Sequence, residues 1–220
     1  MQPFNYGYAF WYEQLGIEAH IAKFAPQNRQ GKNGFETTDY DSRYQLFAGI
    51  SEAVNNGGEG LRTLSYTTSD GATTHLLLTD PEAVHLEDVA NLIDLLVPIG
   101  WAALILLIVL VVTARLGKLT LPGIGKSLLT LLAIAVLCAI VIVAVGAHDV
   151  FKAMHEMVFP DDHQWFFYYQ DSLMTTLMKA PDIFFAIGAV WAVLASVIYL
   201  LLSLLLQAMG YKYQRQGHQG

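Results

Sequence analysis

The sequence predicts a mainly α-helical membrane protein with a small α+β domain, containing a β-hairpin, outside the bilayer. Composition is the first reason: 54% of the 220 residues are apolar and only 14% are charged, which excludes a disordered chain. Three uncharged apolar runs are the second reason, because a helix of roughly 20 residues crosses the hydrocarbon of a bilayer. These predicted spans are residues 95–114, 127–147 and 183–206.

The charged side chains outside the spans predict their orientation. Residues 1–94 hold 5 basic and 13 acidic side chains, and residues 148–182 hold 2 basic and 6 acidic ones. The loop 115–126 holds 3 basic side chains and no acidic one, and the tail 207–220 is also basic. Short basic loops stay in the cytoplasm. We therefore expect residues 1–94 and 148–182 to be extracytoplasmic and the loop and the tail to be cytoplasmic.

Charge and cysteine content exclude other classes of protein. The formal net charge of −7 argues against nucleic acid as a partner, because binding phosphates needs a face rich in Lys and Arg. The single cysteine excludes a disulfide framework within the chain. The sequence also lacks the Gly-x-Ser-x-Gly elbow of serine hydrolases and the glycine-rich loop that cradles phosphates.

The extracytoplasmic domain begins with helical patterns. Residues 4–22 are predicted to be helical with an aromatic face, and residues 24–37 to form a loop. A helix over residues 40–55 follows, capped by Thr38 or Asp39 and ended by an Asn-Asn-Gly-Gly run.

The aromatic cluster in residues 4–12 has two interpretations. It is either a belt at the membrane interface, at the end of a preceding helix, or a packing cluster inside the domain. A domain outside the membrane normally follows a signal peptide or a helix, and the start of the sequence, Met1-Gln2-Pro3-Phe4, has neither the basic nor the apolar region of a signal peptide. We therefore expect a fourth, N-terminal transmembrane helix that this sequence lacks.

A β-hairpin is predicted next. Its strands cover residues 61–68 and 73–79 and flank a Ser-Asp-Gly-Ala turn. Alternation of apolar residues predicts that Tyr66 of the first strand shares a face with Leu76 and Leu78 of the second.

A helix is predicted to begin at Asp80 and to run on into the first span. Asp80 is expected to be its cap, with Pro81 and Glu82 in the first turn, where proline and acidic side chains are favoured.

The second extracytoplasmic segment joins the middle span to the last one. Residues 148–159 are predicted to continue the helix of the middle span, and Pro160 to end it. Residues 165–169, with the sequence Trp-Phe-Phe-Tyr-Tyr, are too aromatic for a free loop, and we place them in the headgroup zone.

Two stretches with histidines are candidates for chemistry, because imidazole takes up and releases a proton near neutrality. His85 precedes Asp88 by one helical turn, close enough for the carboxylate to orient or charge the ring. The alternative is a surface ion pair near a helix start.

His155 is the second candidate. His148 lies two helical turns earlier on the same face, about 10 Å away by helix rise. Acidic residues nearby make a metal site conceivable, but no close pair of histidines has ligand spacing. We predict no metal and no cofactor.

Two stretches together resemble signatures of the bacterial lipoprotein intramolecular transacylase (Lit) family. The first is His85-Leu86-Glu87-Asp88-Val89, which leads into a span. The second comprises His155-x-x-x-Phe159, Asp162, Trp165, Asp171 and Pro181-x-x-Phe184-Phe185. From about residue 38 onward the predicted topology agrees with that of the family. The sequence differs from the family in two ways: the first helix is missing, and Pro160 stands where the family tends to have an apolar or small residue.

The resemblance implies a multi-pass protein of the bacterial cytoplasmic (inner) membrane whose partners are membrane lipids and diacylated lipoproteins. The reaction would move the sn-2 acyl chain of a diacylglyceryl-cysteine to the α-amine of the same cysteine. On this interpretation the catalytic residues are His85, Asp88 and His155, and the substrate-binding residues are Trp165, Asp171 and His148.

Two alternatives remain open from the sequence. One is a non-enzymatic, membrane-anchored binding or assembly protein, whose histidines are only surface groups. The other is a lipid-active hydrolase or transferase of different specificity on the same scaffold. A polar pocket beside both histidines would favour an enzyme, whereas a flat exposed apolar patch would favour a binding protein.

Overall fold

The computed structural model describes residues 5–69, 71, 73–116 and 123–216. For Arg115 and for residues 208–216 it describes the backbone alone. Residues 117–122 of the predicted loop 115–126 therefore lie outside the described residues, as do Asp70 and Ala72 of the predicted turn and the last four residues of the predicted tail.

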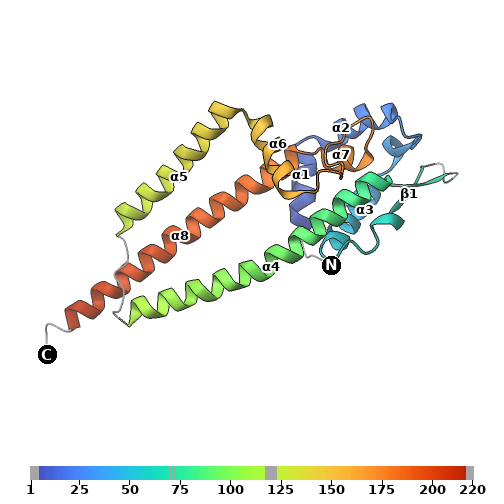
Figure 1. Ribbon diagram of the computed structural model, residues 1–220. Coiled ribbons are helices and arrows are strands. Elements are labelled where there is room, and N and C mark those ends of the chain that lie inside the picture. Colours follow the sequence, from blue (N-terminus) through green and yellow to red (C-terminus); the bar gives the residue numbers. More distant parts are fainter. Residues whose placement is uncertain (1–4, 70, 72, 117–122, 217–220) are drawn as a thin grey trace. The chain divides into compact units, whose positions relative to one another are not determined.

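The described part of the chain is mainly helical and contains one two-stranded antiparallel sheet, as predicted (Figure 1). Three helices, α4, α5 and α8, are long and apolar enough to cross a membrane. The helices, in order, are α1 (Tyr8–Gln14), α2 (Ile17–Phe24), α3 (Tyr40–Val54), α4 (Asp80–Arg115), α5 (Ile124–Val145), α6 (Ala147–Val158), α7 (Leu173–Met178) and α8 (Asp182–Gln216). The 3-10 helices are η1 (Asn5–Gly7), η2 (Ala25–Gln27), η3 (Phe35–Thr37) and η4 (Leu61–Thr63), and the strands are β1 (Ser65–Thr67) and β2 (Thr74–Leu76).

The chain divides into two compact units, and the division falls inside two of the long helices. Unit 1 comprises Met1–Val97 and Val158–Ile187, and unit 2 comprises Pro98–Met157 and Gly188–Gly220. The boundaries within helices lie at Pro98 of α4, at Val158, the last residue of α6, and at Gly188 of α8.

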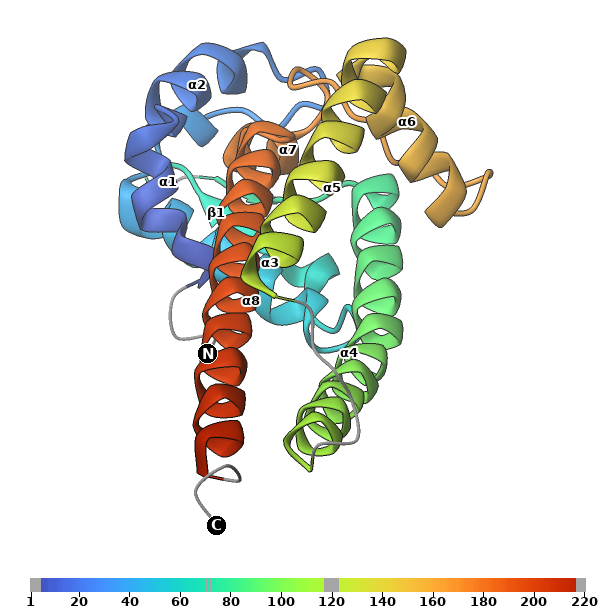
Figure 2. The same cartoon turned by 90° about the vertical axis from the view of Figure 1, so that its left-hand side faces the viewer.

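Unit 1 is built around one hydrophobic core. All six residues of the short helix α7 are buried, and this helix packs against α2 and α3. Figures 1 and 2 both show α7 beside α2. Tyr8 and Tyr12 of α1 also lie in this core, with 0% and 6% exposure. For these two residues the packing interpretation of the aromatic cluster is therefore correct, whereas Phe10 is 58% exposed.

The helical segment predicted for residues 4–22 is broken into α1 and α2. The break lies at Gly16, whose φ of +60° is a left-handed conformation that costs glycine little. Helix α3 begins as predicted, because Asp39 Oδ1 accepts a hydrogen bond of 2.7 Å from the backbone N–H of Ser42.

A buried hydrogen bond joins the first and the second part of unit 1, and its removal should lower stability. The Tyr8 hydroxyl donates to the carbonyl oxygen of Leu177 at 2.9 Å. Tyr8→Phe is expected to lower the free energy of unfolding by about 1–2 kcal/mol, because a buried carbonyl loses its partner. Thermal unfolding of the purified full chain in detergent measures this change.

Tyr44→Phe is the control for this prediction. Tyr44 is partly buried in the same core, and its hydroxyl makes no hydrogen bond within the described part of the chain. A loss of stability as large in Tyr44→Phe as in Tyr8→Phe would contradict the assignment to the hydrogen bond.

The hairpin is present, but its second strand faces the other way from the prediction. Tyr66 is buried and pairs with His75, and the strands are only three residues long. Leu76 is 55% exposed, whereas Leu77 and Leu78, which follow the strand, are both buried. Alternation alone did not show this because three successive leucines, residues 76–78, fit either register.

Helix α4 begins at Asp80, so the residue in the cap position is Thr79 and not Asp80 as predicted. Glu82 Oε2 accepts hydrogen bonds from the backbone N–H of Thr79 at 2.5 Å and from its hydroxyl at 2.7 Å. This arrangement is one half of a capping box, in which a Glu at the third helical position satisfies the N-terminal backbone.

Unit 2 contains α5, α6 and the apolar parts of α4 and α8. The predicted continuation of α5 into residues 148–159 is wrong, because the helix ends at Val145 and Gly146 adopts a φ of +97°. Helix α6 is thus a separate element, which begins at Ala147 and ends at Val158. Near its first turn α5 contacts α8, where Ser127 Oγ lies 3.5 Å from Ser203 Oγ.

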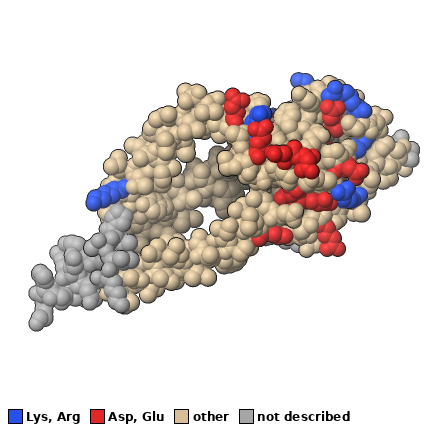
Figure 3. All heavy atoms as spheres, in the orientation of Figure 1, with Lys and Arg blue, Asp and Glu red and all other residues tan. Residues whose placement is uncertain are grey.

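The apolar side chains of the long helices are exposed along their membrane-spanning parts. None of the residues in their most apolar windows is buried in the described structure. In Figure 3 the charged side chains gather over unit 1, while the described surface of the apolar helices is almost free of them. Such an uncharged surface is typical of helices that face lipid.

Candidate functional site

The first predicted stretch lies on the part of α4 that belongs to unit 1. His85 and Asp88 are three residues apart on this helix and are both partly buried. Residues 159–171, which follow α6, also belong to unit 1 and contact this part of α4. The fold thus brings His85 and Asp88 of the first motif into contact with Phe159 and His163, which lie 74 and 75 residues later in the sequence.

The Asp88 carboxylate binds a histidine that sequence analysis did not assign to the site. His163 Nδ1 lies 2.7 Å from Asp88 Oδ2, and the side chains are 35% and 13% exposed. Because a carboxylate only accepts, Nδ1 carries the proton, and the neutral ring keeps its lone pair on Nε2. The hydrogen bond to Asp88 raises the pKa of His163, while burial opposes this shift and the charges of Asp88 and Asp162 add to it.

His85 lies in an aromatic environment. The centre of its ring is 5.0 Å from that of Phe159, in an edge-to-face arrangement, and 6.0 Å from that of Phe167. Both phenylalanines come from the segment 159–171, so this segment covers His85 as well as Asp88. The predicted pairing of Asp88 with His85 itself stays a prediction.

His155 and His148 lie on α6 in unit 2. His155 Nδ1 is 2.8 Å from the carbonyl oxygen of Phe151, and the centre of the Phe151 ring lies 4.0 Å from that of the imidazole, at a tilt of 42°. Since a carbonyl only accepts, Nδ1 is protonated, and the ring can donate a second proton only as the imidazolium. His148 is highly exposed, and its Nδ1 lies 3.9 Å from Asp149.

Helix α6 has a polar and an apolar side. Lys152 and Glu156 form an ion pair of 2.8 Å on one side, and the carboxylate raises the pKa of Lys152. Met154 and Met157 expose 53% and 82% of their surface. This pattern is typical of a helix that lies in the interfacial plane of a membrane.

The remaining predicted site residues, Trp165 and Asp171, lie in unit 1. Asp171 Oδ2 accepts a hydrogen bond of 2.6 Å from the Arg29 guanidinium, so an ion pair joins it to the loop after α2. Trp165 is partly buried, and the centre of its indole ring lies 6.0 Å from that of Phe166.

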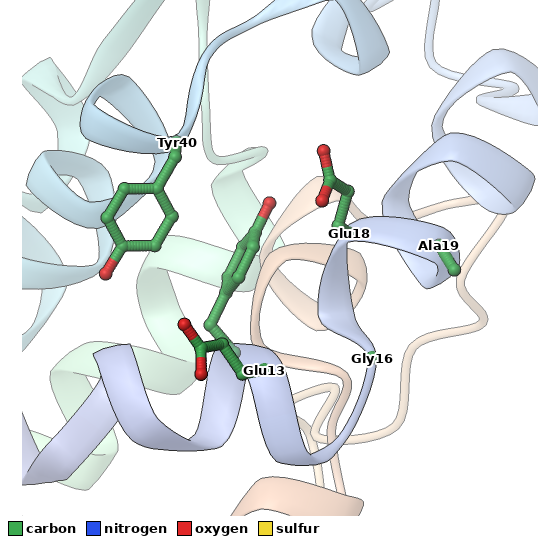
Figure 4. A pocket seen from close by; sticks show the side chains of 6 residues that line it. Glu13, Gly16, Glu18, Ala19 and Tyr40 are labelled. Carbon is green, nitrogen blue, oxygen red and sulfur yellow. The ribbon is translucent and has the colours of Figure 1, made fainter.

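An open pocket of ≈ 550 Å³ lies elsewhere in unit 1, between α1, α2 and α3 (Figure 4). Figure 4 shows the carboxylates of Glu13 and Glu18 and the ring of Tyr40 around it. None of the predicted site residues lines this pocket. Within the described ranges, no group of three or more His, Cys, Asp or Glu side chains is arranged to hold a metal ion.

His163 could not be found from local spacing. It is 75 residues from Asp88 and belongs to a segment without regular secondary structure. The one signal in the sequence is its place within the second motif, directly after Asp162 and two residues before Trp165.

The fold and the site together indicate a multi-pass membrane protein that carries candidate acid/base groups in both of its units. Residues 58–185 match the family described as "Lipoprotein intramolecular transacylase Lit". This match covers more than half of the chain, which therefore belongs to the Lit family, as the sequence resemblance predicted. Comparison with curated proteins and with solved structures gives no match.

The matched range contains every predicted site residue. It begins in the loop before η4 and ends in the first turn of α8. It therefore leaves out α1, α2 and α3, including the pocket of Figure 4.

Proposed function

We propose that this protein moves the sn-2 acyl chain of a diacylglyceryl-cysteine to the α-amine of the same cysteine, by acid/base catalysis with histidines. The family assignment supports action on lipoproteins. The observation that carries the catalytic part is that one segment of unit 1 supplies both His163, which binds Asp88, and Phe159, which contacts His85 one helical turn before Asp88.

The reaction needs no nucleophile from the enzyme. The amine and the ester belong to one substrate molecule, so positioning them lowers much of the barrier. The amine nitrogen attacks the ester carbonyl carbon, and the C–N bond forms as the C–O bond to glycerol breaks. One proton leaves the amine, and one proton arrives on the sn-2 oxygen, so the products are an amide and a free hydroxyl.

His85 is the proposed base that takes the proton from the amine. The ordinary pKa of an α-amine is about 7.7–8.0, so an imidazole is strong enough to remove this proton. His155 is the proposed donor to the oxyanion or to the departing glycerol oxygen, and for this role its ring has to be the imidazolium.

A shared site for His85 and His155 is part of this proposal. His155 precedes Phe159 by four residues in the chain, and the ring of Phe159 contacts His85.

The Asp88–His163 pair adds a second candidate proton donor. Because its pKa is raised, His163 holds its proton to higher pH than an ordinary histidine. Donation from a preorganised group to a developing oxyanion is among the strongest contributions to catalysis. Asp88 is thus proposed to act through His163.

Trp165, Asp171 and His148 are the proposed substrate-binding residues. Trp165 belongs to an aromatic segment suited to the interface between headgroups and acyl chains. The charge distribution supports an arrangement in which residues 1–94 and 148–182 face away from the cytoplasm, on the side where lipoproteins are displayed.

Mass spectrometry of lipoprotein N-terminal peptides tests the proposal. The full chain is expressed in a bacterium whose lipoproteins carry a diacylglyceryl-cysteine with a free α-amine. Intramolecular transfer conserves mass, so we expect a lipopeptide of unchanged mass whose amine no longer reacts with an amine-labelling reagent. Fragmentation should show the acyl chain on nitrogen.

The other outcomes identify different activities. A gain of one acyl chain would indicate transfer from a second lipid, and a loss of one acyl chain with a free amine would indicate a hydrolase. An amine that stays free on a peptide of unchanged mass would contradict the proposal and favour a non-enzymatic role.

A further inference from the structure

Glu82 is a buried carboxylate three residues before His85 on α4. Its side chain has 0% exposure. Oε2 accepts the two hydrogen bonds from Thr79 at the start of the helix, and Oε1 accepts a hydrogen bond from the hydroxyl of Ser172. A single carboxylate therefore joins the start of α4 to the start of α7.

Ser172 closes the segment 159–171. It is fully buried and caps α7, because its Oγ accepts the backbone N–H of Thr175 at 3.0 Å. The same segment carries His163, the partner of Asp88. The contact between Glu82 and Ser172 thus fixes one end of the segment that covers the candidate site.

Lys32 completes this buried cluster. Its Nζ lies 3.8 Å from Glu82 Oε2 and donates a hydrogen bond of 2.7 Å to the carbonyl oxygen of Leu77. Burial lowers the pKa of Lys32, and the charge of Glu82 opposes this shift. Because a buried charge without a partner is costly, removal of Glu82 alone would leave Lys32 in an unfavourable environment.

We propose that Glu82 is a positioning residue for the acyl transfer: through Ser172 it holds the segment 159–171, and with it His163, against Asp88 and His85. The inference rests on the proposed function. A displacement of about 1 Å in a reacting group can cost about 10²-fold in rate, so the contact has a measurable consequence.

Ser172→Ala is the first test, because it removes the contact and keeps both buried charges. We expect the rate of acyl transfer to fall about 10–100-fold. The titration midpoint of His163, measured by NMR on the full chain in detergent, should move toward the ordinary value for histidine. The charges that face this ring are Asp88 and Asp162.

Ser51→Ala is the matched control. Ser51 is 4% exposed in α3, and its hydroxyl has no hydrogen-bond partner within the part of the chain that is described. Ser51→Ala should leave the rate of acyl transfer and the titration midpoint of His163 as in the wild type. A purely structural role of Ser172 would lower the unfolding temperature and leave the pH profile of the remaining activity unchanged.

The second test replaces both buried charges together. Glu82→Met with Lys32→Met keeps the packed volume and leaves no buried charge alone, which limits the loss of stability. We expect the same changes in rate and midpoint as with Ser172→Ala. Glu52→Met, at an exposed position of α3, is the control for the substitution itself.

The results separate the two proposals. Wild-type values of the midpoint and of the pH profile in both variants would overturn the positioning role. If the wild-type chain leaves the α-amine free, the proposed function fails. The His163 midpoint would still show whether Glu82 positions the segment, because this measurement needs no activity.

Discussion

Replacing His85 by alanine is expected to lower the rate of acyl transfer to the α-amine by about 10²–10⁴-fold, the usual contribution of a general acid or base. The reason is that no other group then takes the amine proton at the same place. The measurement is the fraction of lipoprotein amine blocked with time, at equal amounts of the full chain in membranes. His155→Ala is expected to have an effect of the same order, through loss of the proton donor.

A third histidine provides the control for both variants. His75 lies on β2 in unit 1, is partly buried and stacks on Tyr66, at a ring distance of 5.5 Å. His75→Ala should leave the rate within about twofold of the wild type. Unchanged rates in both His85→Ala and His155→Ala would refute the proposed catalytic roles, since the loss of an essential acid or base cannot be silent.

Asp88→Asn is expected to lower the titration midpoint of His163 and to slow acyl transfer at neutral pH. The hydrogen bond to Asp88 is the largest cause of the raised pKa of His163. Without this bond a smaller fraction of the ring is protonated at neutral pH, so the proposed donor carries its proton less often. NMR titration of His163 and the pH profile of transfer measure the two changes.

The Asp88–His163 pair also makes the stability of the folded chain depend on pH. The folded chain holds the His163 proton more tightly than the unfolded chain does, because the pKa is raised in the folded state. The stabilisation is therefore complete below about pH 6.5 and is lost as the pH rises through the folded-state pKa. The unfolding temperatures of wild type and Asp88→Asn should differ most near about pH 6 and converge at alkaline pH. A difference that grows with pH would contradict this account.

The membrane-spanning part of the fold follows from local sequence. Length and uncharged composition alone define a helix that crosses a bilayer, so α4, α5 and α8 could be predicted. The exact residue at which a helix ends was harder to predict, because a glycine such as Gly146 is compatible both with a continuous helix and with a break in it. Its positive φ depends on where the chain goes next.

The candidate site could be predicted only in part. His85 and Asp88 were recognisable because their spacing places them on one helix. The links from Asp88 to His163 and from Glu82 to Ser172 are tertiary contacts, across 75 and 90 residues. No periodicity relates such pairs, and a buried Glu in a first helical turn looks in sequence like any acidic residue near a helix start.

Pro98, where the two units divide within α4, has a consequence for depth in the bilayer. Proline has no N–H, so it offers no helical hydrogen bond to the carbonyl oxygen of Asp94 one turn earlier. An unsatisfied carbonyl in hydrocarbon costs several kcal/mol, by rough estimate. We therefore expect water, polar headgroups or a neighbouring polar side chain to satisfy this carbonyl oxygen, which favours a position of this turn near the membrane interface.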